Sequence, residues 1–184
     1  MAFNQLDKPQ AGETIAIMTT NHGVMKLRIF VDRVGECATN FVELAKQGKY
    51  DGAPFHRIIP GFMIQGGDFT NRNGTGGHAA GGPGTTIDDK YDPCLTHMRG
   101  ALSWAKTMMP HSIGSQFFIV HGDDVHFLDH GNPNVGNGPN AGYSVFGQLY
   151  EGFEVLDEIA GVKTDRRDAP YEDVIIESVK IEQA

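Results

Sequence analysis

Cysteine and tryptophan are scarce in this chain, whose 184 residues include two cysteines and one tryptophan. Cys37 and Cys94 form no CxxC pair and no other metal-ligand spacing, so the sequence indicates neither a zinc site nor a catalytic thiol. In a reducing compartment we expect both thiols to be free, and the sequence leaves a disulfide between them open. Trp104 lies in an apolar run, which favours core packing over a ligand contact.

Long apolar runs and an excess of positive charge are also absent. No stretch is long enough to span a bilayer, and residues 1–10 lack the apolar core of a signal peptide. We therefore expect a cytoplasmic protein with no membrane partner. The formal net charge of −8 argues against a nucleic-acid partner, because such binding depends on neutralising phosphates.

The sequence favours one folded domain. Its hydrophobic content of 40% is enough for a sizeable core. We expect a polar arm over residues 1–13 and a single domain over 14–184. Short apolar runs between turn residues predict a mainly β fold. Strands are expected at 15–20, 24–30, 100–105, 117–120, 144–149 and 174–181, with a further pair inside 55–65.

Helical spacing of apolar residues predicts two helices, over 38–49 and 153–160, each with a glycine near its end. Along the strand 24–30, Lys26 and Arg28 alternate with apolar residues, which predicts one solvated face. Many short strands with two helices favour a closed barrel, because closure removes exposed strand edges.

The segment Phe55–Phe69 combines apolar strands with one arginine and one glutamine. Arg57 is costly to desolvate, so we expect it to meet a partner or a ligand. Strand alternation places Met63 and Gln65 on one face and Phe62 on the other. A guanidinium, an amide and apolar side chains can therefore line one groove. The alternative is a buried strand pair in which Arg57 binds a loop carbonyl.

Four ordered motifs then resemble the cyclophilin family of peptidyl-prolyl cis-trans isomerases. The sequence FHRIIPGFMIQGGDFT is similar to the family's signature. The segments 114–119 (GSQFFI), 127–129 (FLD) and 145–147 (VFG) follow in the family's order, and the resemblance covers about Ile15 to Ile181. It implies a closed eight-stranded antiparallel barrel capped by two helices. It also implies rotation about Xaa-Pro bonds in peptides and in unfolded or folding client proteins.

Rotation about a prolyl bond makes and breaks no covalent bond, so we expect no cofactor and no metal. The amide barrier is about 18–20 kcal/mol. A fixed donor beside the prolyl nitrogen favours the twisted amide over either planar isomer. Arg57 is the candidate donor, and the resemblance places it on the family's catalytic arginine. Gln65 is expected to orient Arg57 and to bind the substrate backbone.

The resemblance also implies the substrate-binding residues. They are His56, Phe62, Met63, Ala105, Lys106, Gln116, Phe118, Phe127, Leu128 and Tyr143. Lys106 is expected to offer main-chain groups. His56 is expected to be a hydrogen-bonded core histidine that supports Arg57 and not a catalytic base.

Three departures from the family pattern concern the rim of the groove. Phe127 replaces a tryptophan, and Tyr143 replaces a histidine after an inserted loop at 130–142. Lys106 and the Met108–Met109 pair alter a third part of the rim. We expect these changes to weaken binding of cyclosporin and to leave the rotation chemistry intact. They are similar to bacterial members, and a monomer is expected.

Two other functions stay open at this level. Six histidine and aspartate residues within 121–130 could bind a divalent ion, although their spacing matches no defined ligand pattern. A binding module for proline peptides on the same fold is the second alternative. Arg57 together with Gln65 favours the enzyme, because a module that only binds needs no transition-state donor. The glycine-rich loop 71–86 shows no phosphate-binding pattern.

Overall fold

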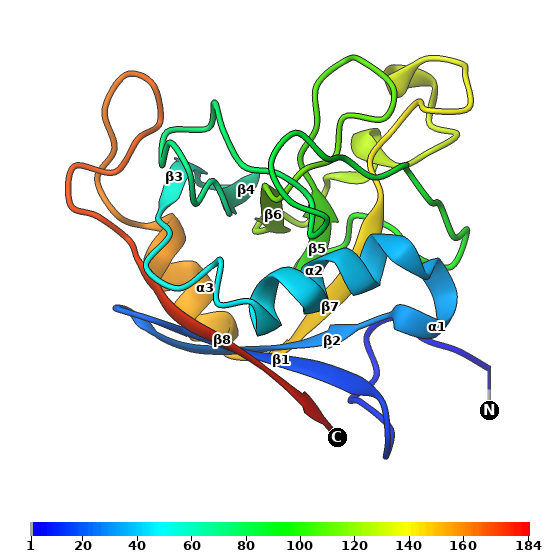
Figure 1. The fold of residues 1–184 in the computed structure, drawn as a ribbon, viewed down its shortest axis with the longest axis horizontal. Coiled ribbons are helices and arrows are strands. Elements are labelled where there is room, and N and C mark those ends of the chain that lie inside the picture. Colours follow the sequence, from blue (N-terminus) through cyan, green and yellow to red (C-terminus); the bar gives the residue numbers. More distant parts are fainter. Residues whose placement is uncertain (1) are drawn as a thin grey trace.

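The computed structural model describes residues 2–184; Met1, the first residue of the expected arm, lies outside this range. Eight antiparallel strands form one sheet in the order β3-β4-β6-β5-β7-β2-β1-β8 (Figure 1). The strands are β1 (Thr14–Thr20), β2 (Gly23–Ile29), β3 (Phe55–Ile59), β4 (Met63–Gly66), β5 (Ala101–Trp104), β6 (Phe117–Val120), β7 (Val145–Glu151) and β8 (Ile176–Gln183). The mainly β fold and the eight antiparallel strands are as expected.

Within residues 2–184 three α-helices accompany the sheet, one more than expected. They are α1 (Val31–Val34), α2 (Glu36–Lys46) and α3 (Phe153–Ala160). Helix α1 was not predicted, because four residues are too few to show helical spacing. No helix within residues 2–184 is long and apolar enough to cross a membrane.

The sheet is an open half-barrel, so the expected closed barrel was wrong. Its edge strands β3 and β8 do not pair, and a single bridge between Pro54 and Ile175 joins the segments that precede them. Beyond that bridge β8 follows β1 along its whole length, while β3 pairs with β4. The outer edge of β3 is covered by a loop instead, since Ile58 N donates to the Asp168 carbonyl at 2.8 Å. Coverage by a loop protects an edge without closure.

The core lies inside the curved sheet and includes buried residues of both α2 and α3 (Figure 1). Trp104 is fully buried, stacks on Phe146 at 4.3 Å between ring centroids, and donates its indole N–H to the Cys37 carbonyl at 2.8 Å. Trp104 is therefore a core residue. Burial also raises the pKa of the Cys37 thiol to about 12, and Cys37 and Cys94 are both free.

Residues 2–13 lie against β2 at Arg28 and cover this part of the face that was expected to be solvated, whereas Lys26 stays partly exposed. Arg28 is 2% exposed. Its guanidinium pairs with Glu13 at 3.0 Å and donates to the carbonyls of Asn4, Gln5 and Asp7. The predicted alternation along β2 is observed, but Arg28 binds residues of the arm in place of water.

Candidate active site

A row of side chains crosses four neighbouring strands on one face of the sheet. Arg57 of β3 is paired with Gln65 of β4, Gln65 with Phe118 of β6, and Phe118 with Ser103 of β5. Directly opposed residues point to the same face. The sequence analysis predicted that the first three residues share a site, and the register brings them together.

A β-bulge interrupts the pairing between Phe55 and Arg57, and His56 is the extra residue. A bulge redirects the side chains around it, which is why such irregularities are frequent beside active sites. Phe55 is buried, whereas Arg57 is exposed. The bulge therefore turns the chain from the core to the groove within two residues.

Apolar side chains form a wall next to this row. Met63 and Phe118 are 2% and 4% exposed, respectively. Phe62 lies 5.7 Å from Phe127 between ring centroids, and Phe118 lies 6.0 Å from Tyr143. Leu128 lies next to Tyr143 in this wall, because the Leu128 carbonyl accepts the Tyr143 N–H at 3.0 Å. The structure thus gathers the predicted apolar residues beside Arg57 and Gln65.

His97 supports this wall from behind, and the sequence analysis did not identify it. Its ring stacks on Phe118 at 5.8 Å. Its Nδ1 lies 2.6 Å from Asp129 Oδ1, and its Nε2 lies 2.9 Å from Ser103 Oγ. Burial lowers the pKa of His97 against the opposing effect of Asp129. No local pattern pointed to His97, because its partners are distant in the sequence.

Gln116 connects the row to the glycine-rich loop. Its amide donates to the carbonyls of Gly74 and Gly76 at 2.9 and 2.8 Å, and its oxygen accepts from Gln65 at 3.1 Å. The Gln65 amide therefore binds Gln116, which fixes its orientation. No hydrogen bond from Gln65 to Arg57 occurs within residues 2–184. The two residues are neighbours across the β3–β4 pair, but Gln65 does not orient Arg57 through a hydrogen bond.

Asp68 fixes the same loop and is a second residue that the sequence analysis missed. It is fully buried, and its carboxylate accepts six hydrogen bonds from residues 70–76. Burial by itself raises the pKa of Asp68, but the backbone donors outweigh burial and lower it to about 2. The loop 68–76 is therefore built around one anion, in the way that an aspartate organises a turn.

The Arg57 side chain makes no ion pair or hydrogen bond with any residue of 2–184 and is open to the groove. His56 beside it differs from expectation, since its buried Nδ1 has no hydrogen-bond partner in the same range. Burial lowers the pKa of His56, and Arg57 adds to this effect. His56 is therefore a neutral packing residue and not a hydrogen-bonded core histidine.

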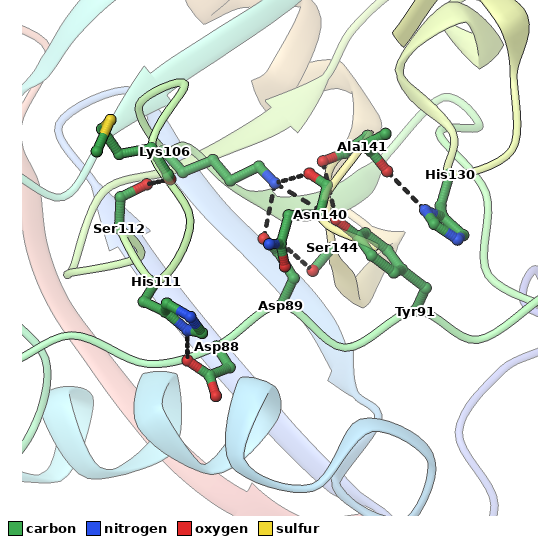
Figure 2. A network of polar contacts seen from close by, with 12 residues as sticks. Asp88, Asp89, Tyr91, Lys106, His111, Ser112, His130, Asn140, Ala141 and Ser144 are labelled. Atoms are coloured by element: carbon green, nitrogen blue, oxygen red, sulfur yellow. Dashed lines mark hydrogen bonds and ion pairs between the residues drawn. The ribbon is translucent and has the colours of Figure 1, made fainter. Parts of the chain in front are cut away.

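Lys106 points its side chain away from solvent, and Figure 2 shows the network around it. Lys106 Nζ lies 2.7 Å from Asp89 Oδ2 and 2.8 Å from the Asn140 carbonyl oxygen. The two charged side chains are 7% and 2% exposed. Asp89 also accepts from Ser144 at 2.6 Å, and the Tyr91 ring stacks on His130 at 4.0 Å (Figure 2). The side chain of Lys106 thus attaches the loop 130–142 to the domain.

The cluster at 121–130 does not converge on one point. His121 contacts Gly61 N and Asp157, whereas His126 contacts Asp129, and His130 contacts the Ala141 carbonyl. Within residues 2–184 no three His, Cys, Asp or Glu side chains are placed to hold a metal ion.

Two neighbouring hollows contain most of the predicted binding residues. One, of about 320 Å³, is lined by Gln65, Ala105, Lys106 and Gln116. The other, of about 520 Å³, is lined by Lys106, Phe127, Leu128 and Tyr143. Lys106 belongs to both, so the two hollows form one groove, which includes Gln65 of the row and Phe127, Leu128 and Tyr143 of the apolar wall. An extended peptide can lie in such a groove with an apolar residue against the wall.

The fold is an open antiparallel half-barrel with an arginine beside an apolar groove, and comparison with known proteins identifies the family. Residues 15–181 match the family described as cyclophilin type peptidyl-prolyl cis-trans isomerase. The chain belongs to this family and is a cyclophilin-type peptidyl-prolyl cis-trans isomerase.

Two curated relatives from bacteria are similar to this chain over nearly its whole length. A putative peptidyl-prolyl cis-trans isomerase of Staphylococcus epidermidis is 37% identical, with 98% of each chain covered. A putative bifunctional phosphatase/peptidyl-prolyl cis-trans isomerase of Streptococcus pyogenes is 41% identical over 98% of this chain, which spans 41% of that protein's length.

Solved structures show the same fold. A cyclophilin type isomerase of Cryptosporidium parvum has a TM-score of 0.81 and 31% identity, covering 94% of this chain and 99% of the other. The same protein crystallised in the presence of the dipeptide Ala-Pro has a TM-score of 0.80 and 32% identity, covering 92% and 99%.

Proposed function

We propose that Arg57 is the catalytic donor of this isomerase and that the groove holds proline-containing segments of peptides and client proteins. The observation that carries this assignment is the position of Arg57. Its guanidinium has no partner within residues 2–184, and it stands beside Gln65 and Phe118 in the cross-strand row. A guanidinium stays charged at any accessible pH and offers several donors in a rigid plane.

The chemistry follows from the prolyl amide. Its cis and trans isomers differ by only about 0.5–1 kcal/mol, so the enzyme has to lower the barrier and not to shift the equilibrium. When the amide twists, the nitrogen loses conjugation and its lone pair becomes an acceptor. Arg57 binds that lone pair, which exists only in the twisted state, and thereby stabilises the transition state selectively.

The other residues position the substrate. The apolar wall of Phe62, Met63, Phe118 and Leu128 receives the proline ring. Gln65, held by Gln116, presents its remaining hydrogen-bonding capacity to the substrate backbone. His56 fills the space behind Arg57, where its lowered pKa keeps it neutral.

Exchange spectroscopy by NMR on a short Ala-Xaa-Pro peptide tests the function directly. The protein, added at a few per cent of the peptide concentration, should broaden the cis and trans resonances or produce exchange cross-peaks between them. Without a catalyst the two isomers exchange over tens of seconds or longer, which is too slow for either effect. Binding without exchange would indicate a proline-binding module instead. Absence of both would contradict the proposed site.

A further inference from the structure

A charged hollow of about 720 Å³ adjoins the cross-strand row on the β3 side. Four chain segments line it, namely 54–57 at the start of β3, Gln65 of β4, the loop at 72–74 and the loop at 165–173. Three of these segments each contribute an arginine: Arg57, Arg72 and Arg167. We call this site the arginine hollow. The mechanism above uses only Arg57, so the other two arginines have no assigned role.

The arginines of this hollow differ from three of the four other arginines; the fourth, Arg166, also forms no ion pair within residues 2–184. Arg28, Arg33 and Arg99 each bind a carboxylate at 3.0, 2.9 and 2.6 Å, respectively. Within residues 2–184 the arginines of the hollow form no ion pair, and Arg72 donates only to the Gly52 carbonyl. In a protein with a formal net charge of −8, a group of unpaired guanidinium groups is a local reversal of charge.

Two carboxylates also line the hollow, Asp165 and Asp173. Asp165 Oδ1 already accepts the backbone N–H groups of Arg167 and Ala169 at 2.7 and 3.0 Å, which holds this carboxylate to its own loop. Neither aspartate neutralises an arginine of the hollow, since neither forms an ion pair within residues 2–184. The lining therefore retains one more positive than negative charge.

The hollow is continuous with the groove. Gln65 and Gly74 line both the arginine hollow and the neighbouring hollow that contains Ala105, Lys106 and Gln116. A peptide whose proline lies at the apolar wall can therefore extend past Gln65 into the arginine hollow. An extended chain advances about 3.3 Å per residue, so side chains within about three residues of the proline come within reach.

We propose that the arginine hollow binds an acidic side chain of the substrate, so that this enzyme prefers Xaa-Pro bonds with a glutamate or aspartate within about three residues of the proline. This inference rests on the proposed function, because it extends the same substrate groove. Guanidinium groups bind carboxylates through paired hydrogen bonds, which gives the selection a geometric component as well as an electrostatic one.

Peptide pairs that differ only by glutamate or glutamine test the proposal. The substitution is placed in turn at one, two and three residues on either side of the proline, and kcat/KM is measured at low and at high salt. At one or more positions the glutamate peptide should be preferred by about two- to fivefold at low salt, the range for exposed ion pairs. The preference should fall at 0.5 M salt through screening.

A matched pair of variants separates a local site from general charge. Arg167→Gln removes an arginine that lines the hollow, whereas Arg166→Gln removes the neighbouring arginine, which does not line it. Arg167→Gln should reduce the glutamate preference by about half or more on the free-energy scale, with turnover of the glutamine peptides unchanged. Arg166→Gln should leave the preference intact.

Three outcomes are informative. Equal rates for glutamate and glutamine at every position would overturn the proposal, and so would an equal loss of preference in both variants. If the glutamine peptides were not isomerised at all, the proposed function itself would be contradicted. This result differs from equal, measurable rates for both peptides, which would contradict only the acidic preference.

Discussion

Lys106 and Asp89 form a buried ion pair at the edge of the groove, with Nζ 2.7 Å from Oδ2 and side chains 7% and 2% exposed. The same ammonium group binds the Asn140 carbonyl, so one side chain joins the segment after β5 to the inserted loop 130–142 (Figure 2). Removing one member of such a pair leaves an uncompensated buried charge.

Lys106→Met should therefore destabilise the protein by about 3–5 kcal/mol, measured by urea unfolding at pH 7. The double variant Lys106→Met with Asp89→Asn should recover part of this loss, since no charge is then buried alone. Lys46→Met is the matched control, because Lys46 is 58% exposed and 4.0 Å from its partner; it should change stability by less than about 1 kcal/mol. Equal effects of the two lysine variants would contradict a buried, compact network.

Arg57→Ala should lower the isomerisation rate constant by about 10²–10³-fold, the range for losing one transition-state donor. Arg57→Lys should recover little of the rate, because an ammonium group lacks the planar fork. Both variants should unfold at nearly the wild-type urea concentration, since the exposed side chain has no protein partner to lose. The rate is measured by a protease-coupled or NMR exchange assay, and wild-type turnover in Arg57→Ala would disprove the mechanism.

The isomerisation rate should be nearly independent of pH wherever the protein is folded, since no step of the proposed mechanism transfers a proton. Stability should behave differently. Burial lowers the pKa of His56 and of His97 below the ordinary value of 6.5. Their stabilising contribution is complete above pH 6.5 and is lost as pH falls toward and through the folded pKa values, because the unfolded chain then binds more protons.

Each of these histidines can add at most about 1.4 kcal/mol per pH unit to the slope of stability against pH. His97→Asn should therefore flatten the decline in unfolding free energy between pH 7.5 and 5.5, while the exposed His111→Asn serves as control.

Asp68 affects stability in a separate pH range. Because its pKa is lowered to about 2, its stabilising contribution is lost only as pH falls below about 4. A bell-shaped kcat profile with the fold intact would indicate an acid or base that we have not assigned.

Phe127 should weaken cyclosporin binding by about one order of magnitude or more relative to tryptophan-bearing family members. Phe127 packs on Phe62 and is 40% exposed, but it has no N–H to donate. A lost hydrogen bond costs about 0.5–1.5 kcal/mol, and more if its acceptor is left buried and unpaired. Each 1.4 kcal/mol is about tenfold in affinity. Phe127→Trp should restore part of the affinity in a calorimetric titration, and an unchanged Kd would refute the donor argument.

The sequence by itself determined the mainly β class and the family, because alternation and the order of motifs are local properties of the chain. The count of eight strands came from the resemblance to the family, and the closed barrel that it also implied was wrong. Helix α3 was predicted at Phe153–Ala160 and observed there, since apolar spacing and a terminal glycine both mark it. The predicted grouping of Arg57, Gln65 and Phe118 also agrees with the strand register.

Only the tertiary structure decided which distant residues serve as partners. The sheet stays open because loop 165–170 covers the β3 edge, which no strand pattern encodes. The burial of Arg28 depends on the arm, and the support of Phe118 by His97 depends on a contact across 21 residues. The arginine hollow joins segments more than 90 residues apart. Such contacts are set by packing between elements, whereas a sequence pattern reports only neighbours along the chain.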